Sequence, residues 1–314
     1  MGTRLCAVSV DLDEIPNYFA IHGLPEPVGA ARTLVYDVAL DRLSELASEL
    51  AIPLTLFAIG SDLSRPESAA KLKALSTAGF EIANHSLDHR YDLVRLGRVE
   101  IRRQVEEGAR AIERATGAPP AGFRAPGYTV TDELFGVLTD LGVEYDSSVF
   151  PCPAYFAAKA TKLLTIAMRR RRSHSIFGSP RVLGAPTRPY RVGSPYWRRG
   201  DGLLELPIQV TRHMRLPFIG TTLTMAGPHV SRRLARACVG EPLVNLELHG
   251  IDVLDASDGL ESLALHQPDV RVSLARKLHS LRSAIGELAQ AGYSFVTLRA
   301  AAKAIRETPQ AATS

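Results

Sequence analysis

The chain has 314 residues, 46% of them hydrophobic and 22% charged, a balance that suits one large globular domain with a packed core and excludes a disordered chain. Its three cysteines are scattered without Cys-x-x-Cys spacing, so neither a disulfide scaffold nor a zinc finger is expected. The net charge of +4 is compatible with an anionic partner such as a phosphorylated substrate, a nucleic acid or a membrane surface.

The N-terminal segment is a short apolar run that ends in acidic residues, GTRLCAVSVDLDE after Met1. It lacks the apolar stretch and the small-residue cleavage site of a secretory signal peptide. No window of about 18 residues is uncharged and apolar enough to span a bilayer. We therefore expect a cytoplasmic protein, with peripheral attachment to the inner membrane as an alternative.

Strand-like and helix-like segments alternate along the chain. Short apolar runs predict strands at Leu5–Val10, Leu54–Ile59, Phe80–Ala83, Gly122–Arg124, Glu144–Tyr145, Leu203–Leu206, Leu243–Leu248 and Ser294–Leu298. Apolar residues at helical spacing predict helices at 31–50, 66–78, 95–116, 131–141 and 269–291. Strands that alternate with helices predict a parallel α/β sheet, and about eight strands in one repeating pattern favour a β/α barrel.

Residues 147–200 interrupt this pattern. They contain eleven Lys and Arg residues and no Asp or Glu, whereas the rest of the chain has an excess of acidic residues. Five apolar residues share one helical stripe just before the run Arg169–Arg172: Phe156, Ala160, Leu163, Leu164 and Ala167. Such a segment could lie on an anionic bilayer through residues 154–172. The alternative is a helical lid that packs on the barrel, with solvated arginines.

Two polar clusters directly follow predicted strands in the N-terminal half. Asp11 and Asp13 end the first strand, where two carboxylates so close together need a cation or a proton between them. His85 and His89 follow the third strand at a spacing that points both imidazoles the same way on a helical turn, and neutral imidazoles suit Zn²⁺, Ni²⁺, Co²⁺ or Fe²⁺. The simpler alternatives are an acidic surface turn and a pair of structural histidines.

Two further clusters follow later strands. Arg124 precedes the turn Pro126-Gly127-Tyr128, which indicates a fixed cation beside backbone amides that could bind an oxyanion, or else a structural turn with a surface arginine. His249 with the nearby Asp252 is a candidate general acid, although a lone histidine is more often structural. Asp146 supplies another carboxylate at the same end of the predicted sheet.

The order of these clusters resembles the polysaccharide deacetylase family, carbohydrate esterase family 4, also called the NodB-homology domain. The resemblance spans about residues 5–151 and 203–298. It implies a distorted (β/α) barrel of about seven to eight strands, with one domain over residues 1–314 and a basic insertion at about 152–202. The chain departs from the family where Leu12 separates two acids that are usually adjacent, and where Arg90 replaces the usual proline.

The resemblance also implies roles for the residues of these clusters. Catalysis is expected from Asp11 as general base, oriented by Arg124, and from His249 as general acid, tuned by Asp146 or Asp252. A divalent metal, zinc before cobalt, nickel or iron, is expected on Asp13, His85 and His89, with Glu14 as a fallback ligand. Oxyanion and substrate contacts are expected from Pro126, Gly127 and Tyr128.

The implied activity is metal-dependent hydrolysis of an N-acyl amide, acetyl or formyl, on an amino sugar or glycoconjugate, either soluble or lipid-linked. One alternative is an amidohydrolase that acts on a non-sugar amide. Another is a non-catalytic binding protein. No nucleic-acid partner is expected, because the basic segment is an insertion in an enzyme-like frame and contains no recognised nucleic-acid-binding module.

Overall fold

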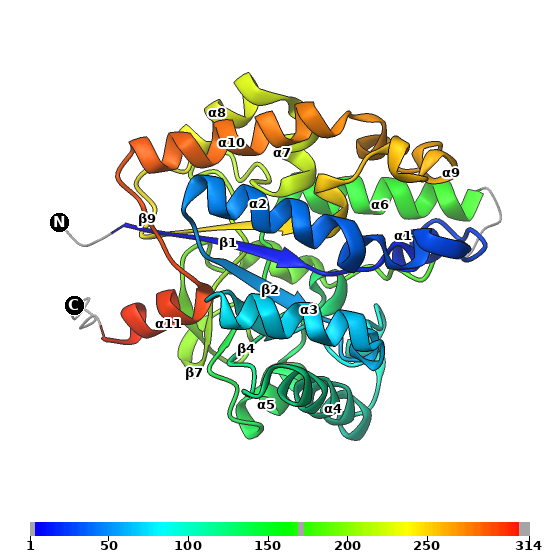
Figure 1. Cartoon of the computed structure of the whole chain (residues 1–314). Helices are drawn as coiled ribbons and strands as arrows, with labels where there is room; N and C mark the ends of the chain where they lie inside the picture. Colours follow the sequence, from blue (N-terminus) through cyan, green and yellow to red (C-terminus); the bar gives the residue numbers. More distant parts are fainter. Residues whose placement is uncertain (1–3, 169–172, 308–314) are drawn as a thin grey trace.

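The computed structural model describes residues 4–168 and 173–307. Its centre is a curled sheet whose strands follow the order β6-β7-β5-β4-β3-β2-β1-β8, with β9 also paired to β1 (Figure 1). All these pairs are parallel except β6 with β7. The predicted distorted (β/α) barrel of about seven to eight strands is confirmed. The strands are β1 (Leu5–Asp11), β2 (Leu54–Ala58), β3 (Glu81–Asn84), β4 (Gly122–Phe123), β5 (Tyr145–Asp146), β6 (Tyr190–Val192), β7 (Arg199–Glu205), β8 (Leu243–His249) and β9 (Ser294–Phe295).

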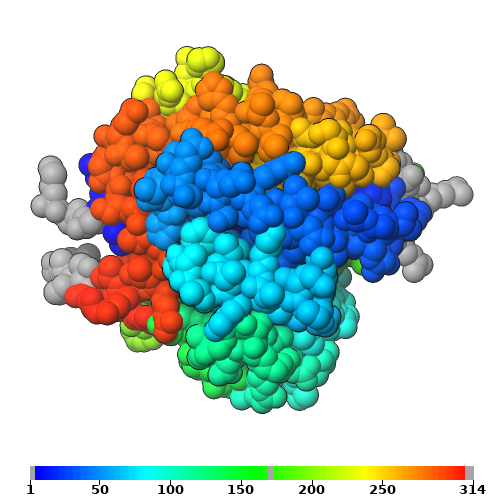
Figure 2. All heavy atoms as spheres, in the orientation of Figure 1, coloured from blue at the N-terminus to red at the C-terminus, as the bar shows by residue number. Residues whose placement is uncertain are grey.

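Helices coat the outside of this sheet. In Figure 1, α7, α8 and α10 lie above the strands, α3, α4 and α5 lie below them, and α2 lies in front. Side chains of α2, α3 and α10 cover much of the face seen in Figure 2. The helices are α1 (Ile15–Ile21), α2 (Leu40–Leu50), α3 (Pro66–Thr77), α4 (Arg98–Thr116), α5 (Asp132–Asp140), α6 (Pro153–Met168), α7 (Gly220–Ala226), α8 (Pro228–Arg236), α9 (Glu261–Ala264), α10 (Leu274–Gln290) and α11 (Leu298–Glu307).

The alternation of side chains along β1 positions the site. Val8 and Val10 pack into the large cluster under the outer helices, whereas Ala7 packs with Phe57 and other residues of the barrel interior. Successive strand residues point to opposite faces, so Ser9 and Asp11 point inward like Ala7. The last inward residue of the strand is therefore a carboxylate at the carboxyl end of the barrel, where β/α barrels carry their functional groups.

The predicted helix at 31–50 is correct only over its second half. Residues 29–33 form a 3-10 turn and residues 35–39 a π-helical turn before α2 begins. The buried carboxylate of Glu14 accepts hydrogen bonds from the backbone N–H groups of Val35 and Tyr36, at 3.0 Å each, and so fixes this irregular start. Glu14 is thereby committed to the backbone and does not join the predicted metal ligands.

The segment between β7 and β8 completes the barrel without regular strand pairing among the described residues. The Asn245 amide donates to the carbonyl oxygens of Leu206 and Pro207, and Gln209 N–H donates to the Asn245 carbonyl. The basic segment itself forms α6, β6 and the start of β7. The prediction of one domain with an insertion at 152–202 stays a prediction. In the described part of the chain, no helix is long and apolar enough to cross a membrane.

Candidate active site

Asp13, His85 and His89 converge at the carboxyl end of β1 and β3. Asp13 Oδ1 lies 3.2 Å from His85 Nε2 and 3.1 Å from His89 Nε2, and all three side chains are buried. Burial alone would raise the pKa of Asp13, but the two imidazoles hold it well below its usual range. These three predicted metal ligands are therefore brought together.

The other ring nitrogens of the two histidines are oriented by outer partners. His85 Nδ1 lies 2.8 Å from the Arg124 carbonyl oxygen, and His89 Nδ1 lies 3.2 Å from Asn17 Oδ1. Each Nδ1 faces an acceptor and can hold the ring proton there, which would free the Nε2 lone pair for a metal ion. Sequence reasoning did not find Asn17, which lies on α1.

The convergent atoms fit a divalent cation. Asp13 Oδ1, His85 Nε2 and His89 Nε2 are buried and have no hydrogen-bond partner among the described residues. Buried polar atoms without partners are costly, and a divalent metal would satisfy all three at once. Two imidazole nitrogens and one carboxylate oxygen form a ligand set that leaves coordination positions open, as catalytic zinc sites do.

The local backbone around the histidines differs from the predicted helical turn. Residues 85–90 form an irregular loop in which Ser86 and His89 have φ of 69° and 51°. The side chain of Gln104 holds this loop, since it accepts from Asp88 N–H at 3.0 Å and donates to Asp88 Oδ2 at 2.7 Å. Left-handed backbone at residues other than glycine is a conformation that persists only where surrounding contacts enforce it.

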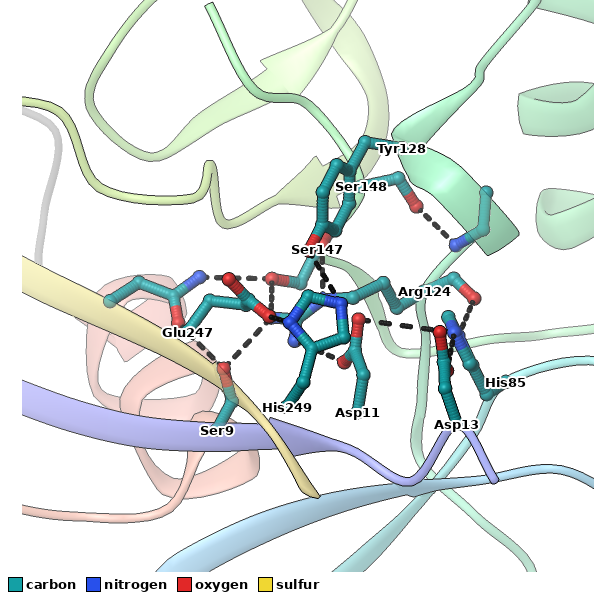
Figure 3. A network of polar contacts seen from close by, with 12 residues as sticks. Ser9, Asp11, Asp13, His85, Arg124, Tyr128, Ser147, Ser148, Glu247 and His249 are labelled. Carbon is teal, nitrogen blue, oxygen red and sulfur yellow. Dashed lines mark hydrogen bonds and ion pairs between the residues drawn. The ribbon is translucent and has the colours of Figure 1, made fainter. Parts of the chain in front are cut away.

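Arg124 is fully buried and fixes Asp11. Its Nη1 donates to Asp11 Oδ1 at 2.6 Å, and its remaining donors reach Ser9 Oγ at 2.9 Å and the Ser147 hydroxyl and carbonyl oxygens at 2.9 and 2.8 Å (Figure 3). The guanidinium also lies 4.0 Å from the centre of the Phe57 ring. The predicted contact between Arg124 and Asp11 is present, and the guanidinium leaves Asp11 Oδ2 facing the side of the metal ligands, 3.8 Å from His85 Nε2.

Asp146 does not contact His249, the residue it was predicted to tune. Its carboxylate accepts from Ser148 N–H at 3.1 Å and from Ser148 Oγ at 2.8 Å, and Ser148 Oγ in turn accepts from Ala125 N–H at 2.8 Å. The neighbouring carboxyl of Glu205 is also buried, and burial together with the Asp146 charge raises the pKa of Glu205 well above its usual range. Asp146 therefore holds the loop after Arg124, beside a Glu205 carboxyl whose neutral form is favoured.

His249 is paired with Glu247, a residue that the sequence analysis missed. His249 Nδ1 lies 2.9 Å from Glu247 Oε1, and its Nε2 lies 3.2 Å from the Tyr128 hydroxyl. Burial opposes the charged imidazolium, but the Glu247 carboxylate raises the pKa of His249 well above its usual value. Asp252, the other predicted tuning residue, accepts from His249 N–H at 2.8 Å and so caps the turn after β8.

The turn Pro126-Gly127-Tyr128 contributes the Tyr128 phenol to the site, and the oxyanion donor predicted from a loop amide near Tyr128 stays a prediction. Tyr128 N–H donates to the Ala125 carbonyl at 3.0 Å, which removes it as an oxyanion donor. Gly127 and Tyr128 have φ of 63° and 58°, and this left-handed pair turns the Tyr128 phenol toward His249 (Figure 3). Gly127 and Tyr128 line the pocket described next.

A cavity of about 380 Å³ lies over these groups. Asp11, Asp13 and His249 lie among its lining residues, and α6 forms one wall through Ala154, Tyr155, Ala158, Lys159 and Lys162. Its volume falls within the range of small-molecule sites, roughly 300–1,000 Å³. The alternative of a helical lid on the barrel therefore fits residues 154–162 of α6. The Arg169–Arg172 part of the predicted membrane-contact segment lies outside the described residues.

Fold and site together form a distorted β/α barrel with a candidate metal centre and a candidate acid and base around one pocket. Residues 36–145 match the family model for polysaccharide deacetylase, so the predicted resemblance to the polysaccharide deacetylase family is confirmed. The matched segment contains His85, His89 and Arg124. A search of curated protein sequences finds no match.

Solved structures share the fold at low sequence identity. A protein assigned as a polysaccharide deacetylase from Mycobacterium smegmatis is 18% identical, with a TM-score of 0.59 over 96% of this chain and 91% of its own. The family 4 esterase domain of a xylanase from the Trinervitermes trinervoides hindgut metagenome is 14% identical, with a TM-score of 0.51 over 98% and 94%. A family 4 pseudoenzyme from Bacillus anthracis is 14% identical, with a TM-score of 0.51 over 96% and 66%. Since an inactive protein has this fold too, activity must be argued from the residues of the site.

Proposed function

We propose that the protein is a metal-dependent hydrolase that removes an N-acyl group, acetyl or formyl, from an amino sugar or glycoconjugate. One observation carries this proposal. A base candidate held by Arg124, an acid candidate held by Glu247 and an Asp-His-His cluster with unpartnered ligand atoms all border one pocket. Amide hydrolysis needs all three functions, because an amide nitrogen leaves only when it is protonated.

Asp13, His85 and His89 would hold a divalent ion, zinc before cobalt, nickel or iron, which supplies Lewis-acid polarisation of the acyl carbonyl when bound. Asp11 takes the proton of the attacking water while Arg124 keeps the carboxylate in place. His249 gives its proton to the leaving amine, and Glu247 stabilises the imidazolium until that step. The Tyr128 hydroxyl, 3.2 Å from His249 Nε2, marks where the amine would lie.

The metal site gives the first prediction. We expect about one zinc ion per chain in protein purified without chelator, and we expect His89→Ala and Asp13→Ala to lose it, because each change removes one of three converging ligands. Elemental analysis and zinc competition with a chromogenic chelator measure this. His229→Ala, on the exposed side of α8, is the control and should bind zinc like the wild type. Equal zinc content in all variants would contradict the assignment.

The Glu247–His249 pair gives a second prediction, for pH dependence. A raised His249 pKa keeps the acid form at higher pH, so kcat/KM of the wild type should fall only well above neutrality. In Glu247→Gln the raising charge is gone while burial still disfavours the imidazolium, so the alkaline limb should move down by about one pH unit or more. A pH profile of kcat/KM tests this. An unmoved limb in a folded Glu247→Gln protein would rule out His249 as the acid that this carboxylate tunes.

The alternatives make different predictions in the same assays. A non-sugar amidohydrolase would hydrolyse simple amides and leave N-acetyl and N-formyl sugars intact. A non-catalytic binding protein would bind zinc and sugar without releasing acetate or formate. A mass loss of 42 Da from the substrate indicates deacetylation, and a loss of 28 Da indicates deformylation, as the masses of the two groups require.

Location and membrane contact also belong to the proposal. We propose that the protein is cytoplasmic. We further propose that residues 154–172 contact an anionic membrane. Co-sedimentation with anionic vesicles at low salt tests the contact. Binding that is absent, or that removal of residues 154–172 leaves unchanged, would exclude it.

A further inference from the structure

Two lysines of α6 face the pocket. Lys159 and Lys162 are three residues apart, so they lie on the same side of the helix as the pocket-lining Tyr155 and Ala158. α6 lies at the end of the barrel toward which β1 and β2 point (Figure 1), so these ammonium groups lie over the same cavity as Asp11 and Asp13. The proposed hydrolysis assigns neither lysine a role.

The charges of the two lysines are not neutralised by carboxylates at contact distance. Lys159 Nζ donates to the Gly127 carbonyl at 3.1 Å, and Lys162 Nζ donates to Gln267 Oε1 at 3.3 Å. Both acceptors are uncharged, and within the described residues neither lysine forms an ion pair. Burial lowers the pKa of Lys162, and the more distant Asp269 carboxylate opposes that shift. Burial lowers the pKa of the half-buried Lys159 to about 8, as expected for an ammonium held without a counter-ion.

The two carboxylates that line the pocket, Asp11 and Asp13, and the nearby Glu247 are already committed to other groups. Asp11 is paired with Arg124, Glu247 with His249, and Asp13 with the two metal-site histidines. None of them is free to pair with a lysine of α6. A ligand that brings its own negative charge would therefore supply what the pocket wall lacks.

The remaining walls suit a sugar. Tyr18, Tyr91, Tyr128 and Tyr155 line the pocket, and aromatic rings with polar tips pack against the apolar faces of sugar rings while they hydrogen-bond hydroxyl groups. The Tyr18 hydroxyl is buried and has no hydrogen-bond partner among the described residues. Such an unsatisfied group in a pocket wall indicates a ligand atom that would pair with it.

We propose that the pocket takes an N-acylated amino sugar that carries an anionic group, phosphate or carboxylate, and that Lys159 and Lys162 bind this group while the amide lies over Asp11 and Asp13. The inference rests on the proposed hydrolase function and narrows its substrate class. It disfavours long neutral polysaccharides, because such a ligand leaves both ammonium groups unpaired. Phosphate and carboxylate share the required chemistry, and the substrates chosen below separate them.

The first experiment compares kcat/KM for N-acetylglucosamine 1-phosphate, N-acetylmuramic acid and neutral N-acetylglucosamine. We expect at least one anionic sugar to be preferred over the neutral one by tenfold or more. In Lys159→Met and Lys162→Met this preference should fall by about tenfold to a hundredfold, the range expected for losing a hydrogen bond to a charged group. Lys303→Met, on the exposed side of α11, should keep the preference. A prenyl phosphodiester of N-acetylglucosamine in detergent then separates a lipid-linked from a soluble sugar phosphate.

The second experiment needs no catalysis. Glucose 1-phosphate has no amide, so its binding to the zinc-loaded protein can be measured by calorimetry in the wild type and in the same three variants. We expect binding that weakens at least tenfold in Lys159→Met and Lys162→Met but not in Lys303→Met, with glucose itself binding more weakly. Thermal melting confirms that each variant is folded.

The outcomes separate the two proposals. Hydrolysis of neutral and anionic sugars with equal kcat/KM would overturn the anionic substrate and leave the hydrolase intact. If neither these N-acetyl sugars nor their N-formyl counterparts are hydrolysed with zinc bound, the hydrolase is overturned. The calorimetry then tests the anion site independently of catalysis. Lysine-dependent binding of glucose 1-phosphate supports that site, whereas absent or lysine-independent binding overturns it.

Discussion

Asp11→Asn should lower kcat for N-acyl sugar hydrolysis by about 10²–10⁴-fold while the zinc content stays near one ion per chain. The expected size of the decrease in kcat follows from the usual contribution of a positioned general base to the rate. Asparagine keeps the shape of the side chain but cannot take the proton of the attacking water. The metal stays because Asp13, His85 and His89 are unchanged, and kcat with parallel elemental analysis measures both quantities.

The control for this variant is Asp140→Asn. Asp140 pairs with Arg98 at the surface, with its side chain 51% exposed, so its change should leave kcat within about twofold. Asp11→Asn with full zinc content and kcat near that of the wild type would remove Asp11 as the base. If the variant also loses zinc, the result assigns Asp11 to the metal site instead.

Much of the site could be predicted from the sequence because parallel strands bring their carboxyl ends to one edge. Asp11, His85, Arg124 and His249 each follow or end an apolar run, so a sheet of parallel strands must place them together. The alternation along β1 then decides that Asp11 points inward. No detailed knowledge of the loops is needed for this step.

The partners of these residues could not be predicted in the same way. Glu247 lies within an apolar strand, and only its position two residues before His249, on the same face of β8, marks it as a partner. Asn17 and Glu205 come from elements far along the chain from the residues that they orient, so no local pattern connects them. The helical turn predicted for His85 and His89 was wrong, because contacts from Gln104 and the left-handed backbone at Ser86 decide that loop.

The short elements of the second half were also missed, for a physical reason. α7 has seven residues and α8 nine, so each offers too few turns for a clear apolar period. Both are held by packing against α10, whose own period over residues 269–291 was predicted. The predicted apolar stripe of α6 is only partly covered, since Leu164 is 62% exposed. The residues of α6 that line the pocket lie on nearly the opposite face of the helix.

Arg124→Met should destabilise the protein by about 3–5 kcal/mol, the usual cost of leaving a buried charge unpaired. The fully buried guanidinium joins Asp11 to Ser9 and Ser147, and methionine fills part of the volume without donating to any of them. Urea denaturation of the zinc-free protein measures the free energy of unfolding apart from metal binding. Arg124→Lys keeps the charge but not the planar fork, so it should recover part of the stability and little of kcat.

The double variant Arg124→Met/Asp11→Asn tests whether this cost comes from the buried charge. It removes both members of the ion pair, so its loss of stability should be smaller than the sum of the two single losses. Additive losses would show instead that Arg124 acts through its contacts with Ser9 and Ser147. In that case Arg124 would position the strand ends, and the orientation of Asp11 would follow from the backbone of β1 rather than from the ion pair.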